Sequence, residues 1–474
     1  MDDLDFRPVL ELALRSSLNH LTTLETGSVG ATSTLQDLRS RLNRPFLDDS
    51  LSSEQVVQDL VVDTSGGILG SAGGRFFAWA IGGVLPAALA ADWLTSAWDQ
   101  NAALYSCGPA AAVVEEIAGD WLKELLGLSA TCSIGFVSGC QMAHVTCLAA
   151  ARHQLLQSQG WNVERNGMAG APQIKVLASN RHGSIERAVR LLGIGEGNVL
   201  DLTLDETERL RPETLEVALQ GVTGHPVIVI LQAGDLNTGS FDDYRKLIPL
   251  AKHYSAWVHL DGAFGLWVGA SPNYKHLLDG FADADSWATD GHKWLNVPYD
   301  CGYAIVAHPE AHRGAMSLRA SYLVHDTEAR YQIDWNPEWS RRGRGFPTYA
   351  ALRQLGRLGL GELINRCCRS ASRLVEGLGK IPGVEILWRP IINQGLVRFL
   401  DPSPQANHDR YTDAVIKRVI AHGGAFFMGT TWRSRRAMRI SVMNWRTSER
   451  DIDFAIQTVS ESVSVESAET VFSK

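Results

Sequence analysis

Short apolar runs alternate with helical segments through the middle of the chain. The apolar runs are nearly continuous and rich in β-branched residues, and they lie at 174–179, 227–232, 257–260 and 302–307. Such runs are typical of strands buried on both faces of a sheet. Helical spacing marks the segments at 113–126, 142–158, 184–192 and 242–254. This alternation predicts an α/β domain whose mostly parallel sheet is covered by helices on both faces.

The two ends of the chain have a different pattern. The N-terminal part combines helices with polar loops, and a unit of this size with so few aromatic residues would be marginally stable alone. We therefore expect it to pack on another part of the protein or on a second subunit. The C-terminal part combines long helices at 350–378 and 409–422 with strand-like pieces, which predicts a small α+β domain. The expected parts are 1–75, 76–350 and 351–474.

The composition is that of an ordinary soluble globular protein. The chain has 474 residues, of which 45% are hydrophobic and 20% charged, so a disordered or fibrous chain is excluded. Its formal net charge of −8 predicts no binding to nucleic acid or to an anionic membrane. Seven cysteines without a CxxC pair predict neither a disulfide framework nor a metal site, and they favour a reducing compartment, the cytoplasm.

One uncharged stretch resembles a membrane-spanning segment. Residues 76–91 contain no charge, but they number only 16 and include Gly82, Gly83 and Pro86. A spanning helix needs about 20 apolar residues. The N-terminus opens with acidic residues and shows no signal peptide. We therefore predict a glycine-rich loop that runs into a helix, and no membrane anchor.

The strongest chemical signal is a lysine in the segment SWATDGHKWLNVPYDCGYAIV at 286–306. Lys293 lies between His292 and Trp294, in a loop that leads into an apolar strand. Lysine is rarely buried unless it is paired or reactive. Burial is expected to lower the pKa of this amine and to make it a nucleophile for Schiff-base chemistry. A lysine that extends to the surface is the alternative that this segment alone leaves open.

An aspartate directly follows another predicted strand, in WVHLDGAFGLW at 257–267. The carboxylate of Asp261 should lie at the carboxyl end of that strand, where α/β sheets gather functional residues. Such a carboxylate could keep a ring nitrogen protonated, as pyridoxal phosphate requires. Ala263 is small enough for a planar ring to lie against it. The alternative is an aspartate that caps a helix or a turn.

Two further segments could face the same cleft. His182 follows the strand at 174–179, although a single histidine is more often structural. Residues 138–141 open a predicted helix, whose N–H groups and dipole make a site for a phosphate. Cys140 and Cys147 are seven residues apart, which is core spacing more than metal-ligand spacing.

These segments occur in the order phosphate loop, histidine, aspartate and lysine, and the combination is specific. The chain resembles the group II pyridoxal-phosphate-dependent amino-acid decarboxylases, the family of the aromatic-amino-acid and glutamate decarboxylases. The resemblance runs from about residue 75 to the C-terminus, through FFAWAIGGVLPAALAADW, HGSIERA, QAGDLNTGSFDD, HLDGAFG, DGHKW and RRGRGFPTYAALRQLGRLGL. It implies the aspartate-aminotransferase-like fold (fold type I), pyridoxal 5'-phosphate as cofactor, an L-amino acid as substrate, and a homodimer around which the N-terminal segment wraps.

The resemblance also implies roles for particular residues. Lys293 becomes the internal-aldimine lysine and Asp261 the partner of the pyridine nitrogen. His182 and Ala263 contact the two faces of the ring. Tyr322, on a long loop that ends near residue 345, becomes the acid that protonates Cα after CO2 leaves. The other implied cofactor contacts are Gly139, Cys140, Gln141, Asn237, Asp290 and His292, the last also beside the reacting amine.

Several segments depart from the family pattern and indicate a divergent, bacterial-type branch. The phosphate loop reads SGCQMAH, a turn reads AGDLN, the lysine motif reads DGHK and the substrate entry reads IGG. These departures leave the substrate open. Trp79, Gly82 and Gly83 are expected to line its pocket, and an aromatic-rich loop favours a bulky apolar side chain. Four arginines could instead meet an acidic substrate or form a solvated basic turn: Arg433, Arg435, Arg436 and Arg439.

The expected reaction is decarboxylation of an L-amino acid to its amine through a quinonoid intermediate. In such enzymes the pocket decides which bond at Cα stands perpendicular to the ring and breaks, and the sequence does not reveal that geometry. Tyr322 favours decarboxylation, because a phenol that returns a proton to Cα yields an amine. The alternatives are another reaction on the same scaffold, by an aldehyde synthase, a lyase or an aminotransferase, and a binding protein without activity.

Overall fold

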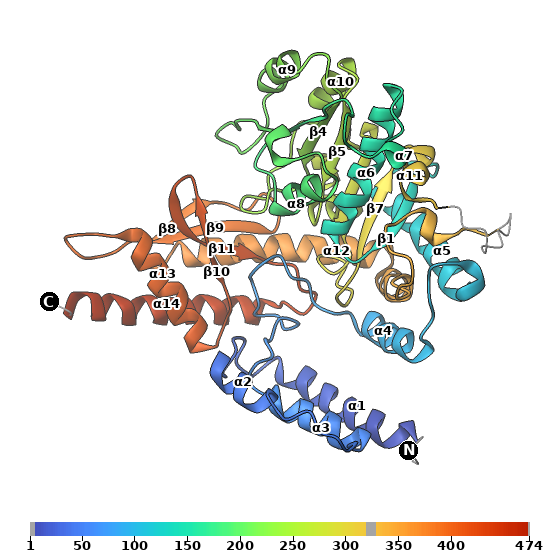
Figure 1. The fold of residues 1–474 in the computed structure, drawn as a ribbon. Helices are drawn as coiled ribbons and strands as arrows, with labels where there is room; N and C mark the ends of the chain where they lie inside the picture. The colour runs from blue at the N-terminus through green and yellow to red at the C-terminus, as the bar shows by residue number, and fades with distance from the viewer. Residues whose placement is uncertain (1–4, 319–328, 473–474) are drawn as a thin grey trace.

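A computed structural model describes residues 5–318 and 329–472 of the protein. Within these residues, seven strands form a large sheet and four form a small one (Figure 1). The large sheet contains β1 (Ser133–Val137), β2 (Lys175–Ala178), β3 (Val199–Asp201), β4 (Val227–Gln232), β5 (Trp257–Asp261), β6 (Ser286–Asp290) and β7 (Gly302–Val306). Its order is β1-β7-β6-β5-β4-β2-β3. Strands β2 to β6 are parallel, whereas β7 is antiparallel to both neighbours.

Helices cover both faces of the large sheet. On one face, α6 (Cys140–Ser158), α8 (Gly183–Leu191) and α11 (Pro309–Met316) form a core with side chains such as Val176 and Ile230. On the other face, α5 (Pro109–Leu126), α9 (Pro212–Gly221) and α10 (Tyr244–His253) form a core with the alternate side chains, such as Leu177 and Leu231. Successive side chains of a strand point to opposite faces, so these continuous apolar strands fill two cores at once. A short helix, α7 (Val163–Asn166), follows α6.

The small sheet has the order β10-β11-β9-β8 and is antiparallel throughout. Its strands are β8 (Val384–Trp388), β9 (Gln394–Phe399), β10 (Met428–Trp432) and β11 (Arg435–Ser441). Two helices pack on this sheet, α13 (His408–His422) and the later part of α12 (Gly345–Leu378). The last helix, α14 (Glu449–Phe472), packs on both of them.

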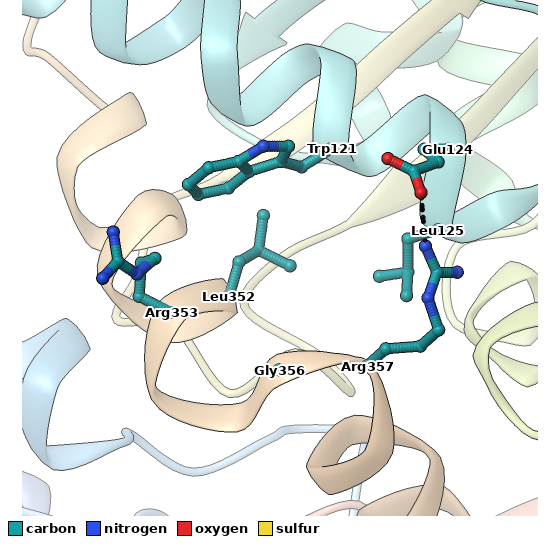
Figure 2. A pocket seen from close by; sticks show the side chains of 7 residues that line it. All are labelled: Trp121, Glu124, Leu125, Leu352, Arg353, Gly356 and Arg357. Carbon is teal, nitrogen blue, oxygen red and sulfur yellow. Dashed lines mark hydrogen bonds and ion pairs between the residues drawn. The ribbon is translucent and has the colours of Figure 1, made fainter.

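Helix α12 runs from the large sheet to the small one and bends at Gly356. The φ of Gly356 is +60°, a left-handed conformation that glycine adopts without steric cost. Beside the bend, α5 and α12 enclose a hollow of about 310 Å³ (Figure 2). Across it, Arg357 Nη2 donates a hydrogen bond to Glu124 Oε1 at 2.8 Å, and the ring of Trp121 forms another wall. None of the residues that line this hollow is one of the predicted site residues.

The N-terminal helices α1 (Phe6–Thr23), α2 (Leu35–Leu42) and α3 (Ser53–Asp63) pack on one another and lie apart from the large sheet (Figure 1). The chain then joins the C-terminal part. The rings of Phe76 and Phe426 stack with centroids 4.9 Å apart, and Phe77 N–H donates to Phe426 O at 2.9 Å. The uncharged stretch 76–91 forms a loop followed by the start of α4 (Pro86–Trp98). Among the described helices, none is long and apolar enough to cross a membrane.

Candidate active site

The carboxyl ends of the parallel strands meet at one edge of the large sheet. Gln232, Asp261 and Ala288 pair across β4, β5 and β6, so the residues that follow these strands lie side by side. A cavity of about 900 Å³ opens at this edge. The predicted site residues in its wall are Trp79, Gly139, Cys140, Gln141, His182, Asn237, Asp261, Ala263, Asp290, His292 and Lys293. Tyr322 lies outside the described residues.

The amine of Lys293 lies in this wall, three residues after the end of β6. Its Nζ is 3.1 Å from Oδ2 of Asp290. Burial disfavours the ammonium ion, but the charges of Asp290 and Asp261 outweigh this effect and raise the pKa of Lys293 above its ordinary value. The expectation that burial would lower this pKa is therefore wrong, because folding places two carboxylates around the amine. Lys293 must give up a proton before it acts as a nucleophile.

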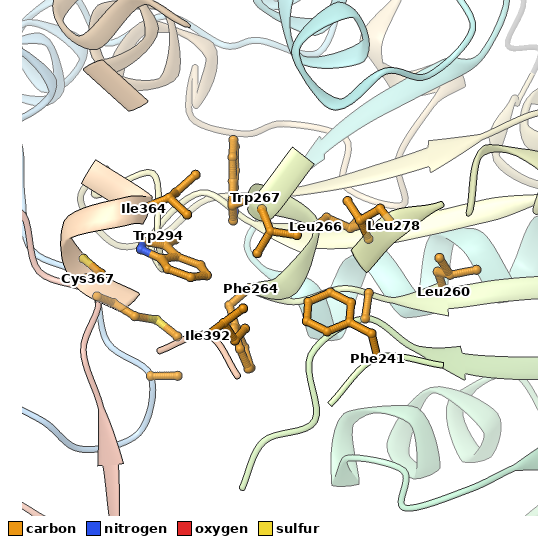
Figure 3. Close-up of a cluster of buried hydrophobic side chains, with 14 of the residues drawn as sticks. Phe241, Leu260, Phe264, Leu266, Trp267, Leu278, Trp294, Ile364, Cys367 and Ile392 are labelled. Carbon is orange, nitrogen blue, oxygen red and sulfur yellow. The ribbon is translucent and has the colours of Figure 1, made fainter. Parts of the chain in front are cut away.

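The loop that carries Lys293 is fixed by the core beneath it. Trp294, the next residue, is fully buried. Figure 3 shows its ring beside Phe264, Ile364 and Cys367, in a cluster that joins the large sheet to α12. A large aromatic side chain in such a cluster anchors the loop firmly. The position of the amine is thus set by packing rather than by the loop's own conformation.

Gly82 and Gly83 lie behind the lysine loop and do not line the cavity, contrary to the expectation from the sequence. A β-carbon at Gly82 would overlap the carbonyl oxygen of Lys293. Gly83 N–H donates a hydrogen bond to Asn296 Oδ1 at 2.7 Å, and a β-carbon there would lie 2.5 Å from Asn444 Oδ1. Close packing explains both glycines: the backbone of Lys293 lies against Gly82, and the side chain of Asn444 lies against Gly83.

Asp290 joins the lysine loop to the start of α6. Its Oδ1 accepts a hydrogen bond from Cys140 N–H at 2.6 Å and lies 3.4 Å from His292 Nε2. Gly139 directly precedes α6, and a β-carbon there would lie 3.0 Å from Cε1 of His292. The absence of a side chain lets the lysine loop pack against the N-terminus of α6, which lies in the cavity wall and whose dipole favours an anion.

A buried chain of polar contacts ends at Asp261. His144 Nε2 lies 3.6 Å from Asp261 Oδ2, and His144 Nδ1 lies 2.9 Å from His259 Nε2. On its other side, His259 Nδ1 lies 2.9 Å from Ser286 Oγ. Burial lowers the pKa of His144 and that of His259 to about 3, so both rings are neutral at neutral pH. The chain therefore lies against the carboxylate of Asp261 without placing a positive charge beside it.

Sequence reasoning missed both histidines. His259 precedes Asp261 by two residues, which places the two side chains on the same side of β5. His144 follows Cys140 by four residues and shares its face of α6. These spacings are signals that could have found the pair. Neither spacing shows that the helix face and the strand meet.

His182 and Ala263 line the cavity from two different loops. His182 is the N-cap of α8, where its Nδ1 accepts a hydrogen bond from Ser184 N–H at 3.2 Å. Burial lowers the pKa of His182, although the charge of Asp261 opposes this effect. Ala263 N–H donates to Asp261 Oδ1 at 3.2 Å. Gln141 Nε2 donates to the carbonyl oxygen of Ser184 at 3.2 Å, which ties the start of α6 to the start of α8.

Asn237 connects the cavity to the C-terminal part. Its Oδ1 accepts a hydrogen bond from Thr430 Oγ1, on β10, at 3.0 Å. The turn that carries it is closed by Asp235, whose Oδ1 accepts hydrogen bonds from the N–H groups of Asn237 and Thr238. Asn180 Nδ2 donates to the other oxygen of Asp235 at 2.6 Å. The AGDLN turn thus links the loops that follow β2 and β4.

The four arginines that the sequence left open divide into two groups. Three form ion pairs with residues outside the cavity wall: Arg433 with Glu208, Arg435 with Glu385 and Arg436 with Asp413. Arg439, on β11, is only 7% exposed and has no hydrogen-bond or ion-pair partner for its side chain within the described residues. Burial lowers the pKa of Arg439 to about 10, so it stays charged, and its charge contributes to the lowered pKa of His182.

Tyr299 also lines the cavity, and sequence reasoning did not single it out. Its ring stacks on His292, with centroids 4.3 Å apart and an interplanar angle of 26°. His292 Nδ1 accepts a hydrogen bond from Cys301 N–H at 3.1 Å, which leaves the proton of the neutral ring on Nε2, facing Asp290. Burial lowers the pKa of His292 and raises that of Tyr299. The imidazole is therefore neutral and the phenol protonated at neutral pH.

Known proteins share both the sequence pattern and the fold of this chain. The profile of the pyridoxal-dependent decarboxylase conserved domain matches residues 36–400. The chain belongs to the pyridoxal-dependent decarboxylase family. It is a carboxy-lyase that decarboxylates an amino acid, and its cofactor is pyridoxal phosphate.

Relatives of this decarboxylase cover almost the whole chain. The aromatic-L-amino-acid decarboxylase of Bacillus atrophaeus is 24% identical over 461 residues, which span 94% of each protein. The solved structure of Oryza sativa TDC with PLP and tryptamine has a TM-score of 0.90 and 22% identity, covering 98% of this chain and 99% of that one. Rhodiola rosea 4-hydroxyphenylacetaldehyde synthase has a TM-score of 0.85 and 22% identity, with coverage of 98% and 99%. These likenesses confirm the predicted fold type I architecture.

The described residues fit pyridoxal phosphate. One cavity wall contains the amine of Lys293, which can link covalently to an aldehyde, and the carboxylate of Asp261, which is 5% exposed. The same wall contains the open N-terminus of α6 at Gly139, which can take a phosphate. Groups that could hold an aldehyde, a ring nitrogen and a phosphate therefore surround one space.

Proposed function

We propose that this decarboxylase converts an aromatic L-amino acid to its amine and CO2, with Lys293 as the residue that holds the cofactor. The composition of the cavity wall carries the proposal: an amine, a buried carboxylate and the aromatic side chains of Trp79, Phe264 and Tyr299 share it. When bound, pyridoxal phosphate supplies an electron sink for the bond that breaks at Cα.

Each side chain of the wall has a distinct proposed task. Lys293 would bind the cofactor through its amine. Asp261, oriented by His144, would hold a proton on the ring nitrogen. His182 and Ala263 would hold the ring between them. The remaining proposed contacts are the start of α6 (Gly139, Cys140 and Gln141) for the phosphate, with Asn237, Asp290 and His292 around it.

Arg439 is the proposed partner of the substrate's own carboxylate. An unpaired guanidinium in a buried place is costly unless an anion meets it. The proposal is supported by the effect of its charge on the pKa of His182, which lines the cavity. Every L-amino acid has this carboxylate, so Arg439 would orient the substrate without selecting its side chain.

The selection of an aromatic side chain is supported by two features of the wall. Trp79 and Tyr299 are 45% and 59% exposed and can cover an aromatic ring, whereas Phe264 is buried behind them. Three of the four candidate arginines for an acidic substrate are already paired elsewhere. Arg187, exposed in the same wall, is the residue that would meet an acidic side chain, so the assay must include acidic amino acids.

The test is a substrate panel that measures CO2 and amine together. Tryptophan, tyrosine and phenylalanine are compared with glutamate, aspartate and cysteine sulfinate. We expect kcat/KM for the best aromatic substrate to exceed that for every acidic one by at least about 10²-fold. Trp79→Ala should raise KM for this substrate about tenfold, since it removes an aromatic contact. The matched control is Trp98→Ala, because Trp98 is also half-exposed but lies outside the cavity wall. Preference for an acidic amino acid would reject the proposed substrate class.

The role of Tyr322 as the acid that protonates Cα stays a prediction. Tyr322→Phe should lower amine formation while the cofactor remains bound. Because an aldehyde synthase has a similar fold, the assay also measures aldehyde, ammonia and hydrogen peroxide. Amine at the wild-type rate from Tyr322→Phe would remove this tyrosine from the mechanism.

We further propose a homodimer in the cytoplasm, with residues 1–75 lying on the second copy. The side chains of Phe6, Leu10, Leu14 and Leu18 are 75%, 58%, 41% and 54% exposed. Residues four apart share one side of a helix, so α1 presents an apolar stripe. This proposal also includes a division of the remaining chain into domains at 76–350 and 351–474. It includes a reducing compartment as well.

A further inference from the structure

We propose that Cys140, His144 and Asp261 form a binding site for a divalent transition-metal ion, such as Zn2+ or Co2+, in the enzyme without its cofactor. All three residues are buried, and their ligand atoms lie within 4.8 Å of one another. The sequence predicted no metal site, because it separates the helix residues from Asp261 by more than a hundred positions. Folding brings the start of α6 against the end of β5.

Two of the three distances between ligand atoms match a tetrahedral ion, and the third is within 4.8 Å. Cys140 Sγ lies 3.4 Å from His144 Nε2, and this nitrogen lies 3.6 Å from Asp261 Oδ2. Around zinc, a Zn–S bond of about 2.3 Å and Zn–N and Zn–O bonds of about 2.1 Å put neighbouring ligand atoms about 3.4–3.6 Å apart. An ion bound to His144 Nε2 can therefore reach both the sulfur and the carboxylate once these two atoms draw to within about 3.6 Å of each other.

The surroundings are also those of a metal site. His144 uses its other nitrogen, Nδ1, in the contact with His259 Nε2 at 2.9 Å, and His259 contacts Ser286 in turn. Such outer contacts fix the orientation of a ligating imidazole. Cys140 and Asp261 also line the large cavity, so the fourth position of the ion would be open to water from that side. On binding, the thiol of Cys140 releases its proton to solvent and the thiolate sulfur bonds to the ion.

The metal and the cofactor would compete for Asp261. This consequence rests on the proposed function, in which the carboxylate of Asp261 faces the ring nitrogen of pyridoxal phosphate. A carboxylate oxygen bonded to a divalent ion cannot serve that nitrogen. The bound metal ion would therefore slow the loading of the cofactor, and the loaded enzyme would resist the metal.

The experiment titrates the full-length apoenzyme with Co2+ and follows absorbance. We expect one equivalent to bind with a thiolate-to-cobalt charge-transfer band in the near ultraviolet, and Zn2+ to bleach that band. Cys140→Ser should lose the band, and His144→Asn should weaken binding. Cys147→Ser is the matched control, because Cys147 is buried on the same helix but its thiol contacts backbone oxygens of Trp287 and Ile305. It should bind Co2+ as the wild type does.

The second arm measures how fast pyridoxal phosphate loads into apoenzyme with and without one equivalent of Zn2+. We expect at least a tenfold slower loading in the wild type and in Cys147→Ser, and no such effect in Cys140→Ser. A band that persists in Cys140→Ser would overturn the site. Unchanged loading in the presence of bound metal would overturn the competition. Neither arm uses a substrate, so a failed decarboxylation assay and a failed metal titration are distinguishable.

Discussion

At the scale of single residues, the state of Lys293 depends on carboxylates contributed by two strands. Asp290 ends β6 and Asp261 ends the neighbouring β5, and together they overcome the effect of burial on the amine. A buried lysine alone would lose its charge. The amine is instead kept as an ammonium ion beside Asp290. This environment favours a covalent partner that keeps a positive charge at the lysine nitrogen.

Lys293→Ala should abolish both the coloured cofactor complex and turnover. The variant removes the only amine in the described cavity wall, so we expect CO2 release to fall by more than about 10³-fold. Absorbance of the purified protein and CO2 release are measured together. Lys275→Ala, at an exposed position outside the cavity, is the control and should keep both properties. Turnover at the wild-type rate in Lys293→Ala would refute the assignment.

At the scale of elements, close contact between two loops positions the lysine. The stretch around Gly82 passes directly against the backbone of Lys293 and leaves no room for a side chain. Gly82→Ala should push the lysine loop away and lower activity by about 10²-fold, since misplacement of a reacting group by about 1 Å has that effect. Cofactor occupancy, measured by absorbance, should fall in parallel. Gly221→Ala is the control, because a β-carbon there meets nothing within 4 Å, and it should behave as the wild type.

A buried ion pair holds the segment 329–344 against α5. Arg341 Nη1 and Nη2 donate to the two carboxylate oxygens of Glu115 at 2.7 and 2.6 Å, and both side chains are almost fully buried. Arg341→Met leaves the charge of Glu115 buried without a partner, so the free energy of unfolding should fall by about 3–5 kcal/mol. Arg341→Met with Glu115→Leu should recover most of this loss. Denaturant unfolding at one protein concentration measures both; equal losses in the single and double variants would contradict the argument.

Elements with a continuous apolar run or a clear helical period were predicted well, and elements with an interrupted pattern were not. The strand at 227–232 has the predicted bounds, and the helices at 113–126, 142–158 and 184–192 differ only at their ends. The strands β1 and β6 were missed because glycine or polar residues interrupt their apolar runs, and β3 was missed because it has only three residues. The sheet pairing of their neighbours, rather than their own propensity, makes them strands.

The pattern of apolar residues also did not predict the direction of β7. An apolar run reads the same in a parallel and an antiparallel strand. The connection from β6 to β7, residues 291–301, is too short to contain a crossover helix, and this length was a usable signal. The reversal places the start of β7 beside Asp290, next to the lysine loop.

At the scale of the whole molecule, the proposed dimer depends on the apolar stripe of α1. Leu10→Glu with Leu18→Glu puts two charges into the apolar stripe of α1. We expect the dimer dissociation constant to rise by at least about 100-fold. Each leucine buried in the interface stabilises the dimer by more than ~1.4 kcal/mol, which corresponds to a factor of about ten. Sedimentation equilibrium measures it. Val217→Glu, at a single apolar residue that is 70% exposed on α9, is the control. A wild-type protein that is monomeric would reject the dimer.

Acid should destabilise the folded protein because three histidines are buried. Burial lowers the pKa of His144, His259 and His312 to about 3 each, whereas an unfolded histidine has a pKa of about 6.5. Between these values the unfolded chain binds more protons than the folded chain. Stability is therefore fully present above pH 6.5 and falls as the pH drops towards 3, by up to about 1.4 kcal/mol per pH unit for each histidine.

The thermal midpoint at pH 7, 6 and 5 measures this dependence. We expect it to fall steadily over that range. His312→Gln should reduce the slope, because it removes one of the three protonation sites without touching the cavity. A midpoint that rises towards pH 5 would show that these histidines do not govern acid stability.

The sequence by itself determined the family, the cofactor, the order of the site segments and the alternation of strands and helices. These properties depend on local residue types and on spacing along the chain. Only the tertiary structure decided which groups touch: the carboxylates that keep Lys293 charged, the histidines behind Asp261, the glycines behind the lysine, and the one arginine of four that remains unpaired near the cavity. Contacts of this kind join residues far apart in the chain, and their energies depend on distance and burial, which exist only after the strands have been placed side by side.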